Sequence, residues 1–227
     1  MEERKTIDLQ KQAFTIKEHV KNLLGKGKVS KVKIEYTPVG ERIVISTNRP
    51  GVVIGRGGEK IAELTRMLKK DFKLDNPHIE IDEILNSDLD SQIVADEIAL
   101  GLERFGPLKF KVLAYRALQR IMKAGALGTE LRLSGKLPGS RAKVWRFAQG
   151  YLKKAGDSAK VVDVANARAE TKPGTVGVRV SILLKTAELK DRVEISDGLI
   201  ETLKSNTEKL NEKPKKATKK KTRKINK

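Results

Sequence analysis

The sequence predicts an α+β (α/β) protein with two small domains of mixed helix and sheet, followed by a basic tail. Three observations support this class. Across residues 15–185, short segments with the strand period of two and longer segments with the helical period follow one another, separated by glycine or proline. A glycine-rich loop stands in the first of the two domains. The last fifteen residues, 213–227, hold eight lysines, Arg223 and no acid.

The length of 227 residues allows one or two domains. A charged tail of this kind cannot bury enough apolar surface to fold alone, so we expect it to be partly disordered and to contact a polyanion. One further helix is expected around Leu199, Leu203 and Leu210. The predicted organisation is an N-terminal arm at 1–14, a first domain at 15–106, a second at 107–185 and a Lys-rich extension at 186–227.

The charge balance indicates that the partner is a polyanion. Lysine and arginine number 48 against 29 acids, which gives a formal net charge of +19 and points to nucleic acid. Aromatic residues make up only 4%, so backbone charge rather than base stacking should dominate binding. The absence of cysteine excludes disulfides and thiolate metal sites. The chain starts without an apolar signal core and has no run of 18 apolar residues, so we expect a cytosolic protein without a membrane contact.

The first domain is predicted to begin with a helix from Thr15 to about Leu24. Thr15 can cap this helix, and Glu18 occupies the position that a capping box requires. Three strands are predicted where charged and apolar residues alternate, at 31–36, 42–47 and 77–82, with a turn at 38–40.

Residues 53–60, Val-Ile-Gly-Arg-Gly-Gly-Glu-Lys, form a glycine-rich loop that opens straight into an amphipathic helix. Glycine has no Cβ and reaches positive φ cheaply, so backbone can approach a phosphate closely. The helix that follows adds unpaired N–H groups and a positive dipole end. We therefore predict that a sugar-phosphate backbone is held by Gly55, Arg56, Gly57, Gly58 and Lys60. A plain turn with a helix cap uses the same residues, so the loop alone leaves that alternative open.

The spacing of the loop excludes two nucleotide-binding loops. A Walker loop that starts at Gly51 needs glycine where Arg56 stands, and a dinucleotide fingerprint needs glycine where Lys60 stands. The loop instead resembles the K-homology signature, which clamps a few nucleotides of RNA backbone. The predicted order of helix, two strands, glycine loop, helix and strand is that of the type II K-homology domain.

Residues 74–103 contain nine acids and neither lysine nor arginine. Clustered carboxylates can bind a metal ion or act in acid–base chemistry. Ser87, Asp88 and Asp90 also suit the start of the next helix, where Asp caps the chain and complements the helix dipole. We favour this second interpretation and expect the acidic stretch to face away from RNA, toward solvent or a neighbouring protein.

Two helices are predicted next, one that ends at Gly106 and one over residues 108–124. The pair is expected to close the sheet of the first domain on one side and to start the second domain. The second helix contains no Asp or Glu, and its basic residues lie on one stripe beside its apolar face. We predict that this stripe faces phosphate: Lys109, Arg116, Arg120 and Lys123.

The second domain is predicted as a strand at 130–133, a loop at 134–139, a helix at 140–154 and two strands at 160–168 and 176–184. Further RNA contacts are expected from its basic residues Arg132, Lys136, Arg141, Lys143 and Arg146. Trp145 and Tyr151 can stack on bases, but residues of this type more often fill the core of a small domain, which we favour.

Four runs of residues resemble the family of small-subunit ribosomal protein three, in its archaeal and eukaryotic branch. They are residues 49–61, residues 122–128, residues 134–139 with Ala142, and residues 174–180, in the family's order. The resemblance spans residues 15–185, and the tail lies outside it. The first run is shared with K-homology proteins in general, whereas the runs of the second domain are far more specific.

This resemblance implies a structural role in the head of the small ribosomal subunit, bound to ribosomal RNA. It also implies a place in the channel through which messenger RNA enters, beside head proteins of which small-subunit proteins two, ten and fourteen are the expected neighbours. Bacterial relatives are credited with unwinding messenger structure there, and their basic residues correspond to the stretch from Arg116 to Lys123.

Two other functions stay open at this point. A free K-homology regulator or RNA chaperone would more often carry repeated K-homology units, and only one is present. A nucleic-acid enzyme is disfavoured because the two histidines, His19 and His78, lie in no recognisable catalytic spacing. We expect no enzyme activity, cofactor or metal.

Overall fold

The computed structural model describes residues 2–37, 40–72, 74, 76–187, 189, 198, 200, 202–204 and 206–207, with the side chains of residues 2–5 left aside. Two sheets lie within the compact unit of residues 1–188, and residues 189–227 form a separate unit. In that second unit the described residues 198, 200, 202–204 and 206–207 are helical. The turn residues 38–39, Leu199, Leu210 and the basic run 213–227 lie outside the described residues. No helix in the described part of the chain is long and apolar enough to cross a membrane.

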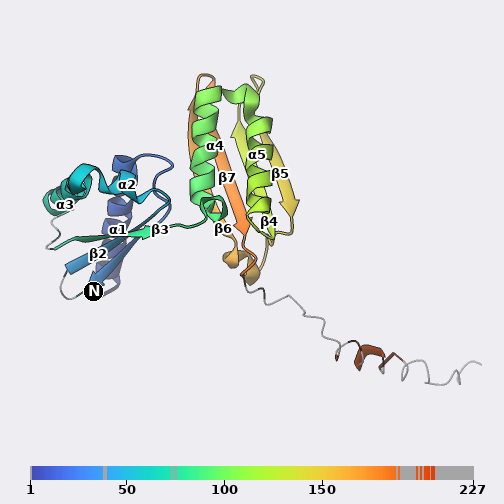
Figure 1. The fold of residues 1–227 in the computed structure, drawn as a ribbon, viewed down its shortest axis with the longest axis horizontal. Coiled ribbons are helices and arrows are strands. Elements are labelled where there is room, and N and C mark those ends of the chain that lie inside the picture. The colour runs from blue at the N-terminus through green and yellow to red at the C-terminus, as the bar shows by residue number, and fades with distance from the viewer. Residues whose placement is uncertain are drawn as a thin grey trace, which may run out of the picture. The chain divides into compact units, whose positions relative to one another are not determined.

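The first sheet has three strands in the order β1-β2-β3: β1 (Val32–Thr37), β2 (Gly40–Thr47) and β3 (His78–Glu83) (Figure 1). β1 pairs antiparallel with β2, and β2 pairs parallel with β3. Two helices, α1 (Glu2–Leu24) and α3 (Glu59–Phe72), share one buried cluster with the sheet, in which Ile43 and Ile45 are fully buried. The predicted order of elements is therefore confirmed.

Helix α1 corrects the prediction for the N-terminal arm. Residues 1–14 were expected to be a loose arm with Thr15 as the helix cap, but the helix starts at Glu2. The Oγ1 atom of Thr15 donates to the carbonyl oxygen of Lys11 at 2.9 Å, which is a bond inside a continuing helix. The polar composition of residues 1–14 wrongly indicated a loose arm, because an exposed helix needs few apolar residues. The buried face of α1 lies near its C-terminal end and includes Ile16 and Val20.

The second sheet has four antiparallel strands in the order β5-β4-β7-β6. The strands are β4 (Gly128–Gly135), β5 (Lys143–Gly150), β6 (Asp163–Thr171) and β7 (Gly174–Leu183). Helices α4 (Ser91–Phe105) and α5 (Phe110–Lys123) lie across one face of this sheet in Figure 1 and share its apolar cluster. The expectation that this helix pair closes the first sheet was wrong. Because the core places α4 with the second sheet, the boundary expected at residue 106 was also wrong.

Strand β5 replaces the helix predicted over residues 140–154. Its residues pair with β4 from Gly135↔Lys143 to Gly128↔Gly150. Trp145 and Phe147 alternate with Arg146 and contact Phe110 of α5, with ring centroids 5.2 and 6.3 Å from that ring. The side chains of this segment therefore alternate between the two faces of the sheet with a period of two. Its backbone N–H and C=O groups form hydrogen bonds with β4 in place of the hydrogen bonds within a helix. The strands predicted at 130–133 and 176–184 are confirmed, whereas the one predicted at 160–168 begins only at Asp163, after a single helical turn at Asp157–Val161.

Candidate nucleic-acid interface

The glycine-rich loop joins a short helix to α3. The short helix, α2 (Pro50–Ile54), was not predicted, and the loop opens through a single turn at Arg56–Gly58. Gly55, Gly57 and Gly58 have φ angles of 76°, 59° and 80°, a region that favours glycine. A Cβ on Gly57 or Gly58 would meet nothing within 4 Å, whereas one on Gly55 would lie 2.9 Å from the side chain of Lys60. The open side of the loop is therefore formed by Gly57 and Gly58.

The two cations of the loop differ in what they contact. The Nζ atom of Lys60 donates to the carbonyl oxygen of Val52 at 3.3 Å, which holds its side chain beside the loop. Arg56 is exposed and forms no hydrogen bond or ion pair with any residue that the structure describes. The loop thus combines accessible backbone at a helix start with an available guanidinium, which suits a phosphate.

The loop yields a direct prediction. Gly57→Asp should lower the affinity of the chain for RNA about tenfold relative to Gly57→Asn, because a carboxylate beside a phosphate costs on the order of 1 kcal/mol or more. The two side chains have the same shape, and both tolerate this backbone region, so the stability of the two variants should match. Filter binding measures the affinity and denaturant unfolding the stability. Equal affinity of the two variants would show that the loop is not part of the RNA interface.

The basic stripe on α5 is only partly available to a ligand. Lys109, Arg116 and Lys123 are exposed. Arg120, in contrast, is half-buried and bonds two acids of the preceding segment, Glu97 at 2.5 Å and Asp88 at 3.7 Å. The hydrogen bond that Arg120 donates to Glu97 outweighs burial and raises the pKa of the Arg120 guanidinium. The prediction that all four cations are unpaired was therefore wrong at Arg120, because its acidic partners come from outside α5.

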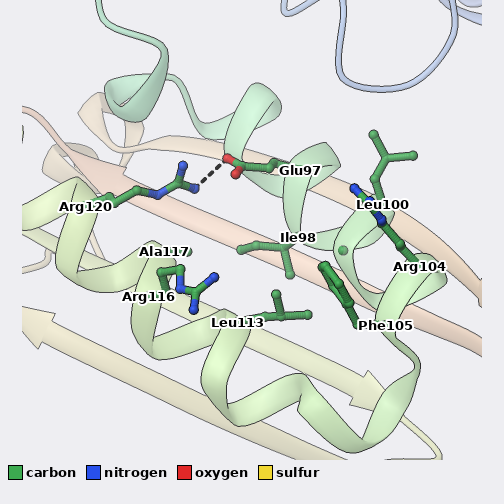
Figure 2. Close-up of a pocket in the computed structure, with 10 residues that line it drawn as sticks. Glu97, Ile98, Leu100, Arg104, Phe105, Leu113, Arg116, Ala117 and Arg120 are labelled. Atoms are coloured by element: carbon green, nitrogen blue, oxygen red, sulfur yellow. Dashed lines mark hydrogen bonds and ion pairs between the residues drawn. The ribbon is translucent and has the colours of Figure 1, made fainter.

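Arg116 lies on the groove between α4 and α5, as Figure 2 shows. This groove has a volume of about 280 Å³, an apolar floor that includes Ile98 and Leu113, and Arg104 and Arg116 at its rim. Arg116 forms no hydrogen bond or ion pair in the described part of the chain. Arg116 therefore projects toward this groove, and its guanidinium is available to bind a ligand.

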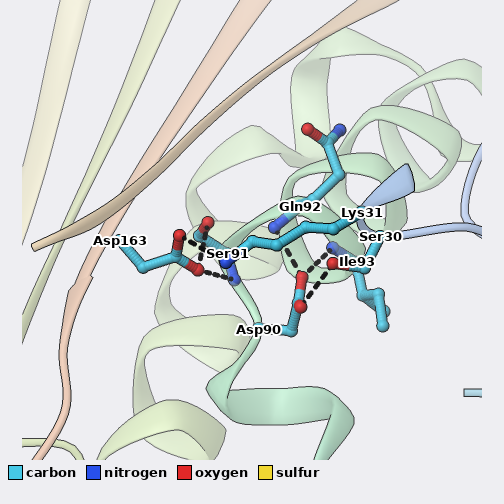
Figure 3. Close-up of polar contacts among 7 residues, drawn as sticks. All are labelled: Ser30, Lys31, Asp90, Ser91, Gln92, Ile93 and Asp163. Carbon is cyan, nitrogen blue, oxygen red and sulfur yellow. Dashed lines mark hydrogen bonds and ion pairs between the residues drawn. The ribbon is translucent and has the colours of Figure 1, made fainter. Parts of the chain in front are cut away.

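The acids of residues 74–103 mostly bond to the chain itself. Asp90 caps α4, since its Oδ1 atom accepts from the backbone of Gln92 and Ile93 at 2.9 and 3.1 Å, and its Oδ2 atom accepts from Ser30 (Figure 3). Glu103 accepts from Lys26 at 3.0 Å, and Asp96 accepts from the backbone N–H of Gly27 at 2.9 Å. The interpretation of Asp90 as a helix cap is confirmed. These acids hold α4 to the segment that precedes β1.

Asp163 contributes to the same contact from β6. Its carboxylate accepts from the side chains of Ser91 at 2.8 Å and Lys31 at 3.0 Å (Figure 3). Burial raises the pKa of Asp163, but these hydrogen bonds outweigh it and lower the pKa.

The basic residues of the second sheet fall into two groups. Lys136 and Arg141 lie in the exposed connection between β4 and β5, and Lys143 starts β5. Arg132 and Arg146 instead meet at a carboxylate that the sequence did not single out, Glu130, which is only 4% exposed. Lys154 also bonds Glu130, at 2.6 Å. The sequence did indicate the contact between Glu130 and Arg132, because residues two apart on a strand lie on the same face.

Trp145 and Tyr151 have different environments. Trp145 packs against the core, and its Nε1 atom donates to the carbonyl oxygen of Leu137 at 3.1 Å. The core interpretation is confirmed for Trp145. Tyr151 is 53% exposed, so the same expectation was wrong for that residue.

Comparison with known proteins agrees with this arrangement. The KH domain family matches residues 15–89, and the family described as ribosomal protein S3, C-terminal domain, matches residues 98–182. A protein of Methanocaldococcus jannaschii is 40% identical over 198 residues, which cover 87% of this chain and 94% of that protein. A protein of Methanobrevibacter smithii is 40% identical over 181 residues, which cover 79% of this chain and 72% of that protein. One of Haloarcula marismortui is 38% identical over 199 residues, which cover 87% and 65% of the two chains.

Each of these relatives carries the name small ribosomal subunit protein uS3. Sequence identities of 38–40% over most of the chain establish membership of this family. The two domain matches follow the same order along the chain as the two sheets. The chain belongs to the uS3 family of ribosomal proteins, with a KH domain followed by the S3 C-terminal domain.

Proposed function

We propose that this chain is a structural constituent of the small ribosomal subunit that binds ribosomal RNA in the head of the subunit and has no enzymatic role. The observation that carries the proposal is the open glycine loop of the KH domain, with Gly57 and Gly58 facing free space and Arg56 available beside them. The family match and the net charge of +19 support the same partner. Sedimentation of the chain with small subunits tests the role.

The RNA contacts should be made to backbone phosphates. Besides the loop, the exposed cations are proposed to contribute: Lys136, Arg141 and Lys143 beside β5, together with Arg132 and Arg146 on the sheet. Phosphate contacts position a protein on RNA, and their number sets how steeply binding falls with salt. A cytoplasmic location follows from assembly into ribosomes.

A contact with messenger RNA is proposed for the exposed face of α5. Lys109, Arg116 and Lys123 keep their charges available there, whereas Arg120 holds α5 to α4. Small-subunit proteins two, ten and fourteen are the proposed neighbours, through the resemblance described above. The free K-homology regulator is the alternative, and the match of the S3 C-terminal domain disfavours it.

The messenger contact can be tested with one substitution. Arg116→Ala should slow translation of a message with a stable hairpin after the start codon more than translation of an unstructured message, because one phosphate contact is lost at the passage. Gln119→Ala, an exposed neutral position of the same helix, is the control. The measurement is the ratio of the two reporter outputs in ribosomes that carry each variant. An unchanged ratio for Arg116→Ala would assign this face to ribosomal RNA or to a protein.

A further inference from the structure

The face of the second sheet opposite α4 and α5 carries a row of arginines. Leu131 and Leu133 of β4 are fully buried toward the helices, so Arg132 between them projects to the other face. In the strand register Arg132 stands directly opposite Arg146 of β5 on one side and Arg179 of β7 on the other. Three neighbouring strands therefore place three guanidinium groups in one line, which we call the arginine row: Arg146, Arg132 and Arg179.

The carboxylate beneath the row neutralises only part of this charge. Glu130 receives hydrogen bonds from Arg132, Arg146 and Lys154, so three cations share one anion. Burial raises the pKa of Glu130, but the hydrogen bonds from Lys154, Arg132 and Arg146 outweigh it and lower the pKa to about 2. Arg179 forms no hydrogen bond or ion pair with any described residue. The row thus retains an excess of positive charge that the described residues do not balance.

Such an arrangement costs stability unless an anion from outside completes it. Like charges directly opposite one another on neighbouring strands repel. The arginines also border a hollow of about 150 Å³, which is lined by Glu130, Arg132, Lys154, Arg179 and Ser181 among others. This volume is well below the roughly 300–1,000 Å³ of pockets that enclose drug-sized ligands. It suits one anionic group of a larger partner.

We infer that the arginine row, with Lys154, is a second RNA-backbone site of this chain, in which Arg179 binds a phosphate of small-subunit ribosomal RNA. The inference rests on the proposed ribosomal function and adds a face that is separate from the KH loop. An acidic protein segment would offer a similar charge. Protein interfaces, however, are enriched at their centres in aromatic side chains and methionine as well as in arginine, and the arginine row supplies only the arginine. The aromatic residues of β5, Trp145 and Phe147, contact α5 and so belong to the helix side of the sheet.

The absence of aromatic side chains along the row also indicates which part of the RNA is bound. Base recognition on a sheet relies on stacking aromatics. The row offers planar guanidinium groups, which form paired hydrogen bonds with phosphate oxygens. The site therefore contacts the sugar-phosphate backbone, and its binding should depend on salt rather than on base sequence.

The first experiment measures binding of full-length chain to protein-free small-subunit ribosomal RNA over a series of salt concentrations. Arg179→Gln should reduce affinity several-fold and lower the slope of log affinity against log salt by about 1. Lys172→Gln removes the same charge from the exposed turn between β6 and β7 and should leave the slope unchanged. Trp145 fluorescence checks folding, and Arg179→Gln should not lower the denaturation midpoint because Arg179 has no partner in the described structure.

The second experiment locates the face in the assembled subunit. The chain has no cysteine, so Asn166→Cys creates a single attachment point at the end of the arginine row, opposite Arg179. An iron chelate tethered there should cleave nearby ribosomal RNA backbone by hydroxyl radicals. Glu59→Cys, beside the KH loop, is probed in parallel. Purified subunits are first tested for the presence of the labelled chain.

The outcomes separate the two proposals. Labelled chain in the subunits with cleavage from residue 166 supports the site. Labelled chain in the subunits without cleavage from residue 166, or with crosslinks from residue 166 to protein alone, overturns it while the ribosomal role stands. Absence of the chain from the subunits contradicts the ribosomal role itself. An unchanged salt slope for Arg179→Gln would also overturn the site.

Discussion

Glu130→Gln is expected to lower the free energy of unfolding of the second domain by about 2–3 kcal/mol at neutral pH. The side chain is 4% exposed and bonds three cations, and its pKa is lowered from 4.5 to about 2. A shift of this size corresponds to about 3 kcal/mol between the charged and neutral forms. Glutamine keeps the shape but loses the charge, so it leaves Arg132, Arg146 and Lys154 repelling one another.

The pH dependence gives this prediction a specific signature. A carboxyl group whose pKa is lower in the folded state stabilises the fold above its unfolded pKa. The stability contributed by Glu130 should therefore be complete above about pH 4.5 and fall progressively toward pH 2. The difference between the natural chain and Glu130→Gln should shrink over that window. Trp145, the single tryptophan, lies on β5 of this sheet and reports its unfolding.

The control is Glu170→Gln, which removes an exposed carboxylate from β6 of the same sheet. It should change the free energy of unfolding by less than about 0.5 kcal/mol. A difference between Glu130→Gln and the natural chain that stays constant from pH 7 to pH 2 would contradict the account of the three-cation contact.

Asp90→Ala is expected to destabilise the start of α4 by about 2 kcal/mol. The carboxylate caps two backbone N–H groups and also accepts from Ser30, so its removal leaves three donors without their partner. Loss of an N-cap costs about 0.5–2 kcal/mol, and loss of a hydrogen bond to a charged group costs about 1.5–3 kcal/mol, with the two not additive. Asp90→Asn keeps a capping oxygen and should lose clearly less.

Two measurements check the Asp90 prediction. Denaturant unfolding gives the loss of stability, and amide hydrogen exchange at Gln92 and Ile93 should accelerate in Asp90→Ala because these N–H groups lose their acceptor. A double-mutant cycle with Ser30→Ala isolates the bond between Asp90 and Ser30. Unchanged exchange at both amides in Asp90→Ala would show that the cap does not hold the start of α4.

The parts of the fold that the sequence predicted are those with local causes. Alternation over β1, β2, β3, β6 and β7, the Asp90 cap and the end of α4 at Gly106 all depend on residues close together in the chain. The parts that failed depend on distant partners. β5 forms because β4 pairs with it, and the N-terminal half of α1 is helical despite its polar composition. The short helix α2 was missed because the residues between the strand at 42–47 and the loop at 53–60 were given no element.

The candidate site shows the same division. The loop glycines were predictable, since positive φ is a property that glycine brings to any turn. The ion pairs of Arg120 were not predictable. Its partners Glu97 and Asp88 lie on preceding elements, and the packing of α4 on α5 brings them close to Arg120. The place of Arg179 was not predictable either, since only the register of three strands, β5, β4 and β7, brings it into line with Arg132 and Arg146.

The most direct test of the ribosomal role is where the full-length chain sediments in a sucrose gradient of lysate from cells that make it. We expect the chain to travel with free small subunits and with translating ribosomes, and to stay with small subunits when low magnesium separates the two subunits. Ribonuclease treatment that destroys ribosomal RNA should release it to the top of the gradient. A chain found at the top of the gradient without that treatment, absent from small-subunit fractions, would contradict the account.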